Sequence, residues 1–216
     1  VHTIEYTRNE TTFSRTYFSS YPDQVMVMRF TADEPGAYTG HVSMSDAHDG
    51  KMEVEGNRIT MKGALDGYVY SGGSTRGRKE PYDIVLDYEA QLLILADGGT
   101  LQASNGRISF SDCDGLTLLL AAGTDYVNQR DRGWKGEHPH ERIRGRLVAA
   151  AEQSFVQDAV FVGSSQSYEI PYLPERTPQK HALGTFHAII CEVRTGSPQE
   201  DIGGEFADDA LERRLH

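Results

Sequence analysis

The densest cluster of potential metal ligands and proton carriers is the segment Glu137-His138-Pro139-His140-Glu141. Two imidazoles and two carboxylates could hold zinc, because neutral histidine and carboxylate oxygen are both ligands of that ion. The spacing matches no established helical zinc motif, and Pro139 favours a loop. Placement of acids at the start of a helix, where they complement the helix dipole, explains the cluster more simply. We expect no metal and no cofactor, with His138 and His140 as the metal alternative.

Carboxylates that could act as a catalytic acid and base are plentiful. Such a pair needs environments that drive the two pKa values apart, and no spacing in the sequence marks one. The candidates flank predicted strands, where solvated or turn-capping roles are the expectation: Asp83, Asp87, Asp97, Asp112, Asp114 and Asp125. We therefore name no catalytic residue.

The segment Gly72-Gly73-Ser74-Thr75-Arg76-Gly77-Arg78-Lys79 combines glycines and cations, as phosphate-binding loops do. It lacks the Gly-Lys-Ser/Thr ending and the apolar helix that would place a phosphate at a helix amino terminus. A connection between strands is the better interpretation. Neither Cys113 nor Cys191 lies in a nucleophile motif, and two distant cysteines predict neither a disulfide framework nor a cysteine zinc site.

Trp134 is the single tryptophan of the sequence and follows Tyr126 in a polar segment. Its ring could stack on the face of a sugar, which makes Trp134 the candidate substrate-binding residue. Packing of Trp134 under its loop, or against a further domain, is the alternative that we favour.

The net charge of the chain limits the classes of molecule that it is expected to bind. The 21 Lys and Arg face 32 Asp and Glu, so the net charge of −11 repels nucleic acid and anionic membranes. A neutral partner such as a sugar fits better. The sequence has no run of 18 apolar residues that could form a spanning helix. Because the sequence starts at Val1, a signal peptide could precede it.

The elements expected to carry these residues are mainly strands. Alternation of apolar and polar residues up to about Tyr126, broken by Gly, Asn and Asp, predicts a large antiparallel β-sandwich of the supersandwich type. Gly56-Asn57 is expected to turn one hairpin, between Met52 and Met61. Asn105-Gly106 is expected to turn a second one, between Leu101 and Phe110.

Two further strands differ in their predicted burial. The segment 116–122 is apolar in both parities, which predicts a central strand covered on both faces. In the segment 84–88, Ile84, Leu86 and Tyr88 alternate with Val85 and Asp87, which predicts a strand with one wetter face.

A helix and an irregular tail are expected to follow the sandwich. Residues 128–141 are polar and predict a long surface loop. Apolar residues then recur at helical spacing, at Ile143, Leu147, Ala151 and Phe155, with Val148 and Ala150 beside them. Further on, 159–162 and 186–193 are strand candidates, Pro171, Pro174 and Pro178 exclude a long helix, and 208–216 could be a short helix.

Two stretches carry a resemblance to a known family. Tyr17 to Val25 reads Tyr-Phe-Ser-Ser-Tyr-Pro-Asp-Gln-Val and is followed by Met-Arg-Phe-Thr-Ala at 28–32. Residues 116–126 read Leu-Thr-Leu-Leu-Leu-Ala-Ala-Gly-Thr-Asp-Tyr. In this order they resemble the amino-terminal domain of glycoside hydrolase family 95, the α-L-fucosidases, from about Ile4 to Phe155.

The resemblance implies a function for the parent protein. Members of that family act on terminal α-L-fucosides or related sugars through a helical barrel, which follows the linking helix and supplies the catalytic residues. The segment after Phe155 is too short for such a barrel, so this chain on its own is expected to lack catalysis. The implied partners are fucosylated glycans, through the parent enzyme, and the missing helical domain; a secreted or periplasmic location is implied too.

We therefore divide the chain into a β-sandwich domain at 1–127, a loop and linking helix at 128–156, and an extension at 157–216. An early stop, a changed reading frame and a genuine divergence would each account for the extension. The alternative function is a free-standing carbohydrate-binding or interaction module built on the same sandwich. A free enzyme with a metal at His138 and His140 is the third hypothesis.

Overall fold

The computed structural model describes residues 1–65, 69–70, 82–83, 86–156 and 189–195, with side chains for 1–65 and 86–153. Within these residues the fold is mainly β, as predicted, with a single helix. The strands are β1 (His2–Arg8), β2 (Thr11–Ser20), β3 (Val25–Ala32), β4 (Tyr38–Asp46), β5 (Lys51–Glu55), β6 (Arg58–Ala64), β7 (Val69–Tyr70), β8 (Tyr82–Asp83), β9 (Asp87–Asp97), β10 (Thr100–Ser104), β11 (Arg107–Cys113), β12 (Gly115–Thr124) and β13 (Ile189–Thr195).

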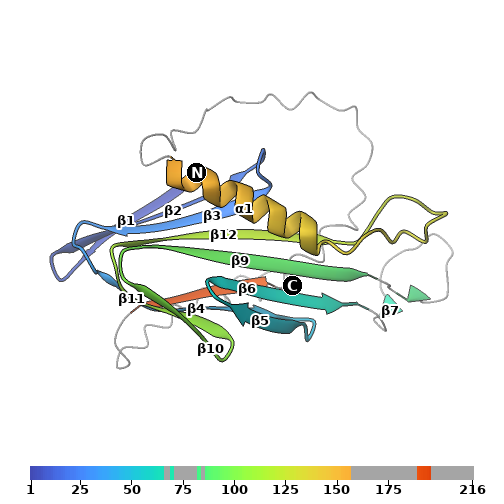
Figure 1. The fold of residues 1–216 in the computed structure, drawn as a ribbon, viewed down its shortest axis with the longest axis horizontal. Coiled ribbons are helices and arrows are strands. Elements are labelled where there is room, and N and C mark those ends of the chain that lie inside the picture. Colours follow the sequence, from blue (N-terminus) through green and yellow to red (C-terminus); the bar gives the residue numbers. More distant parts are fainter. Residues whose placement is uncertain (66–68, 71–81, 84–85, 157–188, 196–216) are drawn as a thin grey trace, which may run out of the picture.

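Two antiparallel sheets form the sandwich (Figure 1). The larger has seven strands in the order β1-β2-β3-β12-β9-β6-β5, and the smaller has four in the order β10-β11-β4-β13. A separate two-stranded sheet joins β7 and β8. Sequential strands pair through hairpins at the edges, whereas β12 crosses over to lie between β3 and β9. The β-sandwich prediction is confirmed.

Both predicted hairpins are confirmed. In the first, Met52 pairs with Met61 across the β5–β6 turn, where Gly56 has a φ of 58°. In the second, Ala103 pairs with Ile108 across the β10–β11 turn, where Gly106 has a φ of 78°. Positive φ at the glycine is the conformation that such tight turns require, so local sequence determines both registers.

β12 is the central strand of the seven-stranded sheet, as its doubly apolar pattern predicts. Leu116 and Leu118 point to the core between the sheets, where they are 1% and 0% exposed. Leu119 and Ala121 point to the opposite, outer face and are buried under the helix. Burial of each leucine stabilises the fold by about 1.5–3 kcal/mol.

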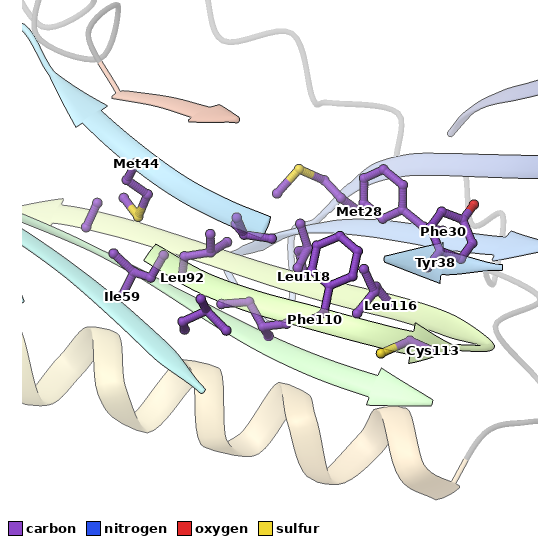
Figure 2. Packing of buried hydrophobic residues seen from close by; sticks show 14 of the residues in the cluster. Met28, Phe30, Tyr38, Met44, Ile59, Leu92, Phe110, Cys113, Leu116 and Leu118 are labelled. Atoms are coloured by element: carbon purple, nitrogen blue, oxygen red, sulfur yellow. The ribbon is translucent and has the colours of Figure 1, made fainter. Parts of the chain in front are cut away.

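The core between the sheets is a layer of aromatic and aliphatic side chains (Figure 2). The rings of Phe30 and Tyr38 meet edge to face with centroids 6.3 Å apart, a favoured arrangement of aromatic quadrupoles. The Tyr38 hydroxyl donates to the carbonyl oxygen of Thr31 at 3.0 Å. Burial raises the pKa of Tyr38 to about 12, because the phenolate would lose its hydration.

The helix α1 (His140–Val156) covers the outer face of the larger sheet over β12, β9 and β3 (Figure 1). Ile143, Leu147 and Ala150 are buried in this second cluster, as the apolar stripe predicts. Val148 is 42% exposed. It lies on the solvent side of the stripe, because one residue after Leu147 the helix has turned about 100°.

β9 differs from the strand predicted at 84–88. Ile84 and Val85 lie outside the described residues, and the strand begins at Asp87 and is buried on both faces from Tyr88 to Ile94. Within the predicted span, Asp87 is partly exposed and Tyr88 is buried, as the alternation predicts. The strand continues to Asp97 between β12 and β6, with the smaller sheet on one side and α1 on the other. A strand in that position needs apolar residues of both parities.

The tail contributes one described strand. β13 pairs with β4 in antiparallel register, from Ile189 opposite Asp46 to Thr195 opposite Gly40, and overlaps the strand predicted at 186–193. The predicted elements at 159–162 and 208–216, and the three prolines between 171 and 178, lie outside the described residues. The division into 1–127, 128–156 and 157–216 stays a prediction. No helix in the described part is long and apolar enough to span a membrane.

Candidate functional site

Several of the residues that the sequence marked for chemistry, Asp87, Asp125, Trp134, His138 and His140, lie at one end of the sandwich, where β12 runs through a loop into α1. We call this region, residues 124–141 together with the start of β9, the junction. The loop projects beyond the end of the sheets (Figure 1). Antiparallel pairing places Thr124 of β12 opposite Tyr88 of β9, so the loop starts beside Asp87.

Asp125 anchors the loop. Its side chain is buried, and its Oδ1 accepts a hydrogen bond from the backbone N–H of Asp87 at 3.0 Å. Its own backbone N–H donates to the Asp87 carbonyl at 3.1 Å, and its carbonyl accepts from Gly136 N–H at 2.6 Å. Asp125 thus joins the end of the loop at Gly136 to Asp87 at the start of β9.

Lys135 neutralises two carboxylates at this anchor. Its Nζ lies 3.1 Å from Asp87 Oδ2 and 3.5 Å from Asp125 Oδ2. The hydrogen bond to Asp87, more than any other contact, raises the pKa of Lys135. Two of the carboxylates considered for catalysis are therefore brought together, but both lie beside the same cation.

The rings of Tyr126 and Trp134 stack in the loop and are both partly exposed. Tyr126 forms an isolated antiparallel bridge with Lys135, and the carbonyl of Trp134 accepts from Val127 N–H at 2.9 Å. The ring planes are 4° from parallel, with centroids 6.5 Å apart. Tyr126 is 54% exposed and Trp134 44% exposed, so Trp134 is not packed under its own loop.

His140, the first residue of α1, is bound to a buried carboxylate. Its Nδ1 lies 2.8 Å from Oε1 and 3.1 Å from Oε2 of Glu89, a β9 residue only 1% exposed. Because a carboxylate can only accept, Nδ1–H of His140 is the donor. The carbonyl of Pro139 accepts the N–H of Ile143 at 3.0 Å and so begins the helix.

His138 lies further from the same carboxylate. Its Nδ1 is 3.9 Å from Glu89 Oε2, beyond hydrogen-bond distance, and 3.4 Å from the backbone nitrogen of His140, whose N–H it accepts. The described residues contain no group of three or more His, Cys, Asp or Glu that could hold a metal ion. The geometry ties His138 and His140 to the start of the helix.

Two further polar side chains complete this network. Gln91 is fully buried, donates to Glu89 Oε1 through Nε2, and accepts from Arg58 Nη1 at 2.7 Å. Burial lowers the pKa of Arg58, and the nearby charge of Arg144 acts in the same direction. Sequence reasoning missed Glu89, Gln91 and Arg58. The available signal was a Glu-x-Gln pair directly before the apolar run 92–96, since buried polar groups need partners.

The remaining candidates lie elsewhere. Asp114 Oδ1 accepts from the backbone N–H of Gly36 at 2.7 Å and so fixes a turn. Cys113 is buried, which raises the pKa of its thiol and disfavours the reactive thiolate. The segment 72–79 lies outside the described residues, and the side chains of Asp83 and Cys191 are not among those described.

Comparison with known proteins indicates the amino-terminal domain of a glycoside hydrolase, which agrees with the β-sandwich fold. The family model described as "Glycosyl hydrolase family 65, N-terminal domain" matches residues 1–129, which include β1 to β12 and the anchor of the junction. The curated protein "Alpha-L-fucosidase 2" of Arabidopsis thaliana is 28% identical over 132 residues. That match covers 57% of this chain but only 16% of the plant protein.

These matches confirm the resemblance to the amino-terminal domain of a glycoside hydrolase, similar to that of an α-L-fucosidase. The matching family model is described under glycosyl hydrolase family 65. The matched region ends inside the loop of the junction, before α1. The chain belongs to the family of glycosyl hydrolase family 65 N-terminal domains.

Proposed function

We propose that this chain is the non-catalytic amino-terminal domain of a glycoside hydrolase of the family 95 type, and that the parent enzyme acts on terminal α-L-fucosides or related sugars. The observation that carries the proposal is the match of residues 1–129 to an N-terminal domain family, together with a curated relative named as an α-L-fucosidase. Because the match covers only 16% of that relative, we place the catalytic residues of the parent outside the matched region.

The contacts made by the carboxylates of the junction support a non-catalytic role. Hydrolysis of a glycosidic bond needs a protonated acid on one side of the sugar and a free carboxylate on the other. Within the described residues, Asp87 and Asp125 share Lys135, and Glu89 is bound by His140 and Gln91. Carboxylates held in this way are structural: they fix the loop and the helix to the sheet.

The role that remains for the sandwich and its helix is to position a neighbouring domain. Glu89 holds the first residue of α1, while Ile143 and Leu147 hold its apolar side on the sheet. A helix fixed at both its start and its flank has one direction, so α1 runs over the sheet along a defined line. In the parent enzyme this would orient the helical catalytic domain, with fucosylated glycans as its substrates and a secreted or periplasmic location.

Two measurements test the proposal. The purified 216-residue chain should release no product from p-nitrophenyl α-L-fucopyranoside or 2′-fucosyllactose, and turnover that survives further purification would contradict a non-catalytic role. The genomic DNA on both sides of the coding region should encode a helical, carboxylate-bearing region in one of the three frames. If such a region is encoded, its expression with this chain should yield a complex that cleaves both compounds.

A further inference from the structure

We propose that Tyr126 and Trp134 form a binding platform for the pyranose ring of a glycan. The two rings are parallel within 4°, lie 6.5 Å apart, and are both about half exposed. The apolar C–H face of a pyranose stacks on such ring faces, while its hydroxyl groups stay free for hydrogen bonds. This inference is independent of the proposed catalytic partner, because it concerns binding by the present chain.

The platform is preformed by the backbone of the loop. Val127 N–H donates to the Trp134 carbonyl at 2.9 Å, and Trp134 N–H donates to the Gln129 carbonyl at 3.0 Å. Trp134 itself has a φ of 66°, an uncommon value for a bulky residue, which these bonds maintain. A strained residue that places an aromatic ring in solvent is a feature of binding sites, and a rigid site loses little entropy on binding.

The loop that carries the rings also carries hydrogen-bonding groups. Lys135 follows Trp134 in the sequence, and its Nζ lies 3.1 Å from Asp87 Oδ2, which pairs a cationic donor with an anionic acceptor. Elsewhere in the loop, Arg132 Nη1 donates to Gln129 Oε1 at 3.4 Å. Paired donors and acceptors suit sugar hydroxyls, which both donate and accept. The lysine charge is already compensated, which favours a neutral ligand.

The size of the patch favours a small ligand over a protein partner. The other large apolar side chains that are exposed in the described part lie outside the junction: Val1, Ile4, Tyr21, Met26 and Val148. Single exposed apolar residues are normal, whereas a stable protein interface buries about 800 Å² on each side around an apolar centre. Two rings with a polar surround match a sugar better.

The test uses Trp134 as its own reporter, because the sequence has no other tryptophan. The 216-residue chain is titrated with methyl α-L-fucopyranoside, 2′-fucosyllactose and cellohexaose up to about 50 mM, where even a weak site saturates. We expect a saturable change in Trp134 emission with at least one glycan. The variant Tyr126→Ala should weaken that binding about tenfold, since it removes half of the stacking surface.

Matched variants separate binding from folding. Tyr21→Ala removes a tyrosine that is 83% exposed in the β2–β3 turn and should leave the affinity unchanged. Trp134→Phe should keep binding and Trp134→Leu should lose it, both measured by saturation-transfer NMR on chains with unchanged circular dichroism. No saturable signal with any of the three glycans, or equal affinity of the Tyr126→Ala variant, would overturn the proposal even if the parent enzyme proves to be a fucosidase.

Discussion

His140 at the start of α1 donates to Glu89 of β9 across 2.8 Å, and Glu89 is 1% exposed. This contact joins two elements that are 51 residues apart in the sequence. Gln91 shares the Glu89 carboxylate, so the negative charge below the helix is satisfied from two sides. A buried carboxylate without such partners would be strongly destabilising.

The first prediction concerns this contact. His140→Ala leaves the buried Glu89 carboxylate with one partner fewer, and should lower the free energy of unfolding by about 2–3 kcal/mol in urea at pH 7. His138→Ala is the matched control, because its Nδ1 is 3.9 Å from Glu89 and its loss should cost less than about 1 kcal/mol. Equal losses for the two variants would show that the 2.8 Å contact contributes little.

A second prediction concerns the buried phenol of Tyr38. The unfolded chain ionises this tyrosine near pH 10, whereas burial raises its folded pKa to about 12. A raised pKa gives stability that is fully present below the unfolded value and is lost as the pH rises towards the folded value. The free energy of unfolding should therefore fall between pH 10 and 12, by up to about 3 kcal/mol.

Tyr38→Phe is the control for that titration. It removes the hydrogen bond to the Thr31 carbonyl and should cost about 1 kcal/mol at pH 7, but it should flatten the decline above pH 10. Urea unfolding at several alkaline pH values, with phenolate absorbance recorded in parallel, measures both effects. An unchanged slope in Tyr38→Phe would assign the decline to other groups.

The third prediction tests the loop anchor. Asp125→Ala removes the acceptor for Asp87 N–H and one carboxylate beside Lys135, and should destabilise the chain by about 1.5–3 kcal/mol. Trp134 emission should change as well, because the loop ends are released. Asp131→Ala, in the exposed part of the same loop, should stay within about 0.5 kcal/mol of the parent chain and keep its emission.

The fourth prediction compares neighbours on α1. Leu147 is fully buried against the outer face of the sheet, so Leu147→Ala should cost about 2–5 kcal/mol through lost burial and a cavity. Val148 is 42% exposed, and Val148→Ala should cost less than about 1 kcal/mol. Thermal and urea unfolding measure both. Comparable losses would mean that the helix lies on the sheet in a different rotation.

Local sequence patterns predicted much of the fold. Asn-Gly and Gly-Asn turns are read from adjacent residues, and the stripe through Ile143 and Leu147 repeats within one helix. The central position of β12 was also accessible, because apolar residues of both parities require cover on both faces. The strand predicted at 84–88 reached only the first two residues of β9, which continues to Asp97.

The sequence identified several residues of the candidate site but not how they are arranged in space. Trp134, His138 and His140 stand out by residue type, so the sequence alone determined which side chains deserved a test. Their partners depended on pairings between distant segments: Glu89 and Gln91 reach the helix start only because β9 and β12 are neighbours. The exposure of Trp134 likewise depends on a φ of 66° and on the Asp125 anchor.

Sequence by itself determined the class of fold, the turns and the apolar faces, because these depend on residues within one turn or one hairpin of each other. Tertiary structure alone decided which carboxylates are neutralised and which aromatic rings remain in solvent. The physical reason is that charge compensation and burial are set by distances in space, and those distances join residues such as Asp87 and Lys135 that lie far apart along the chain.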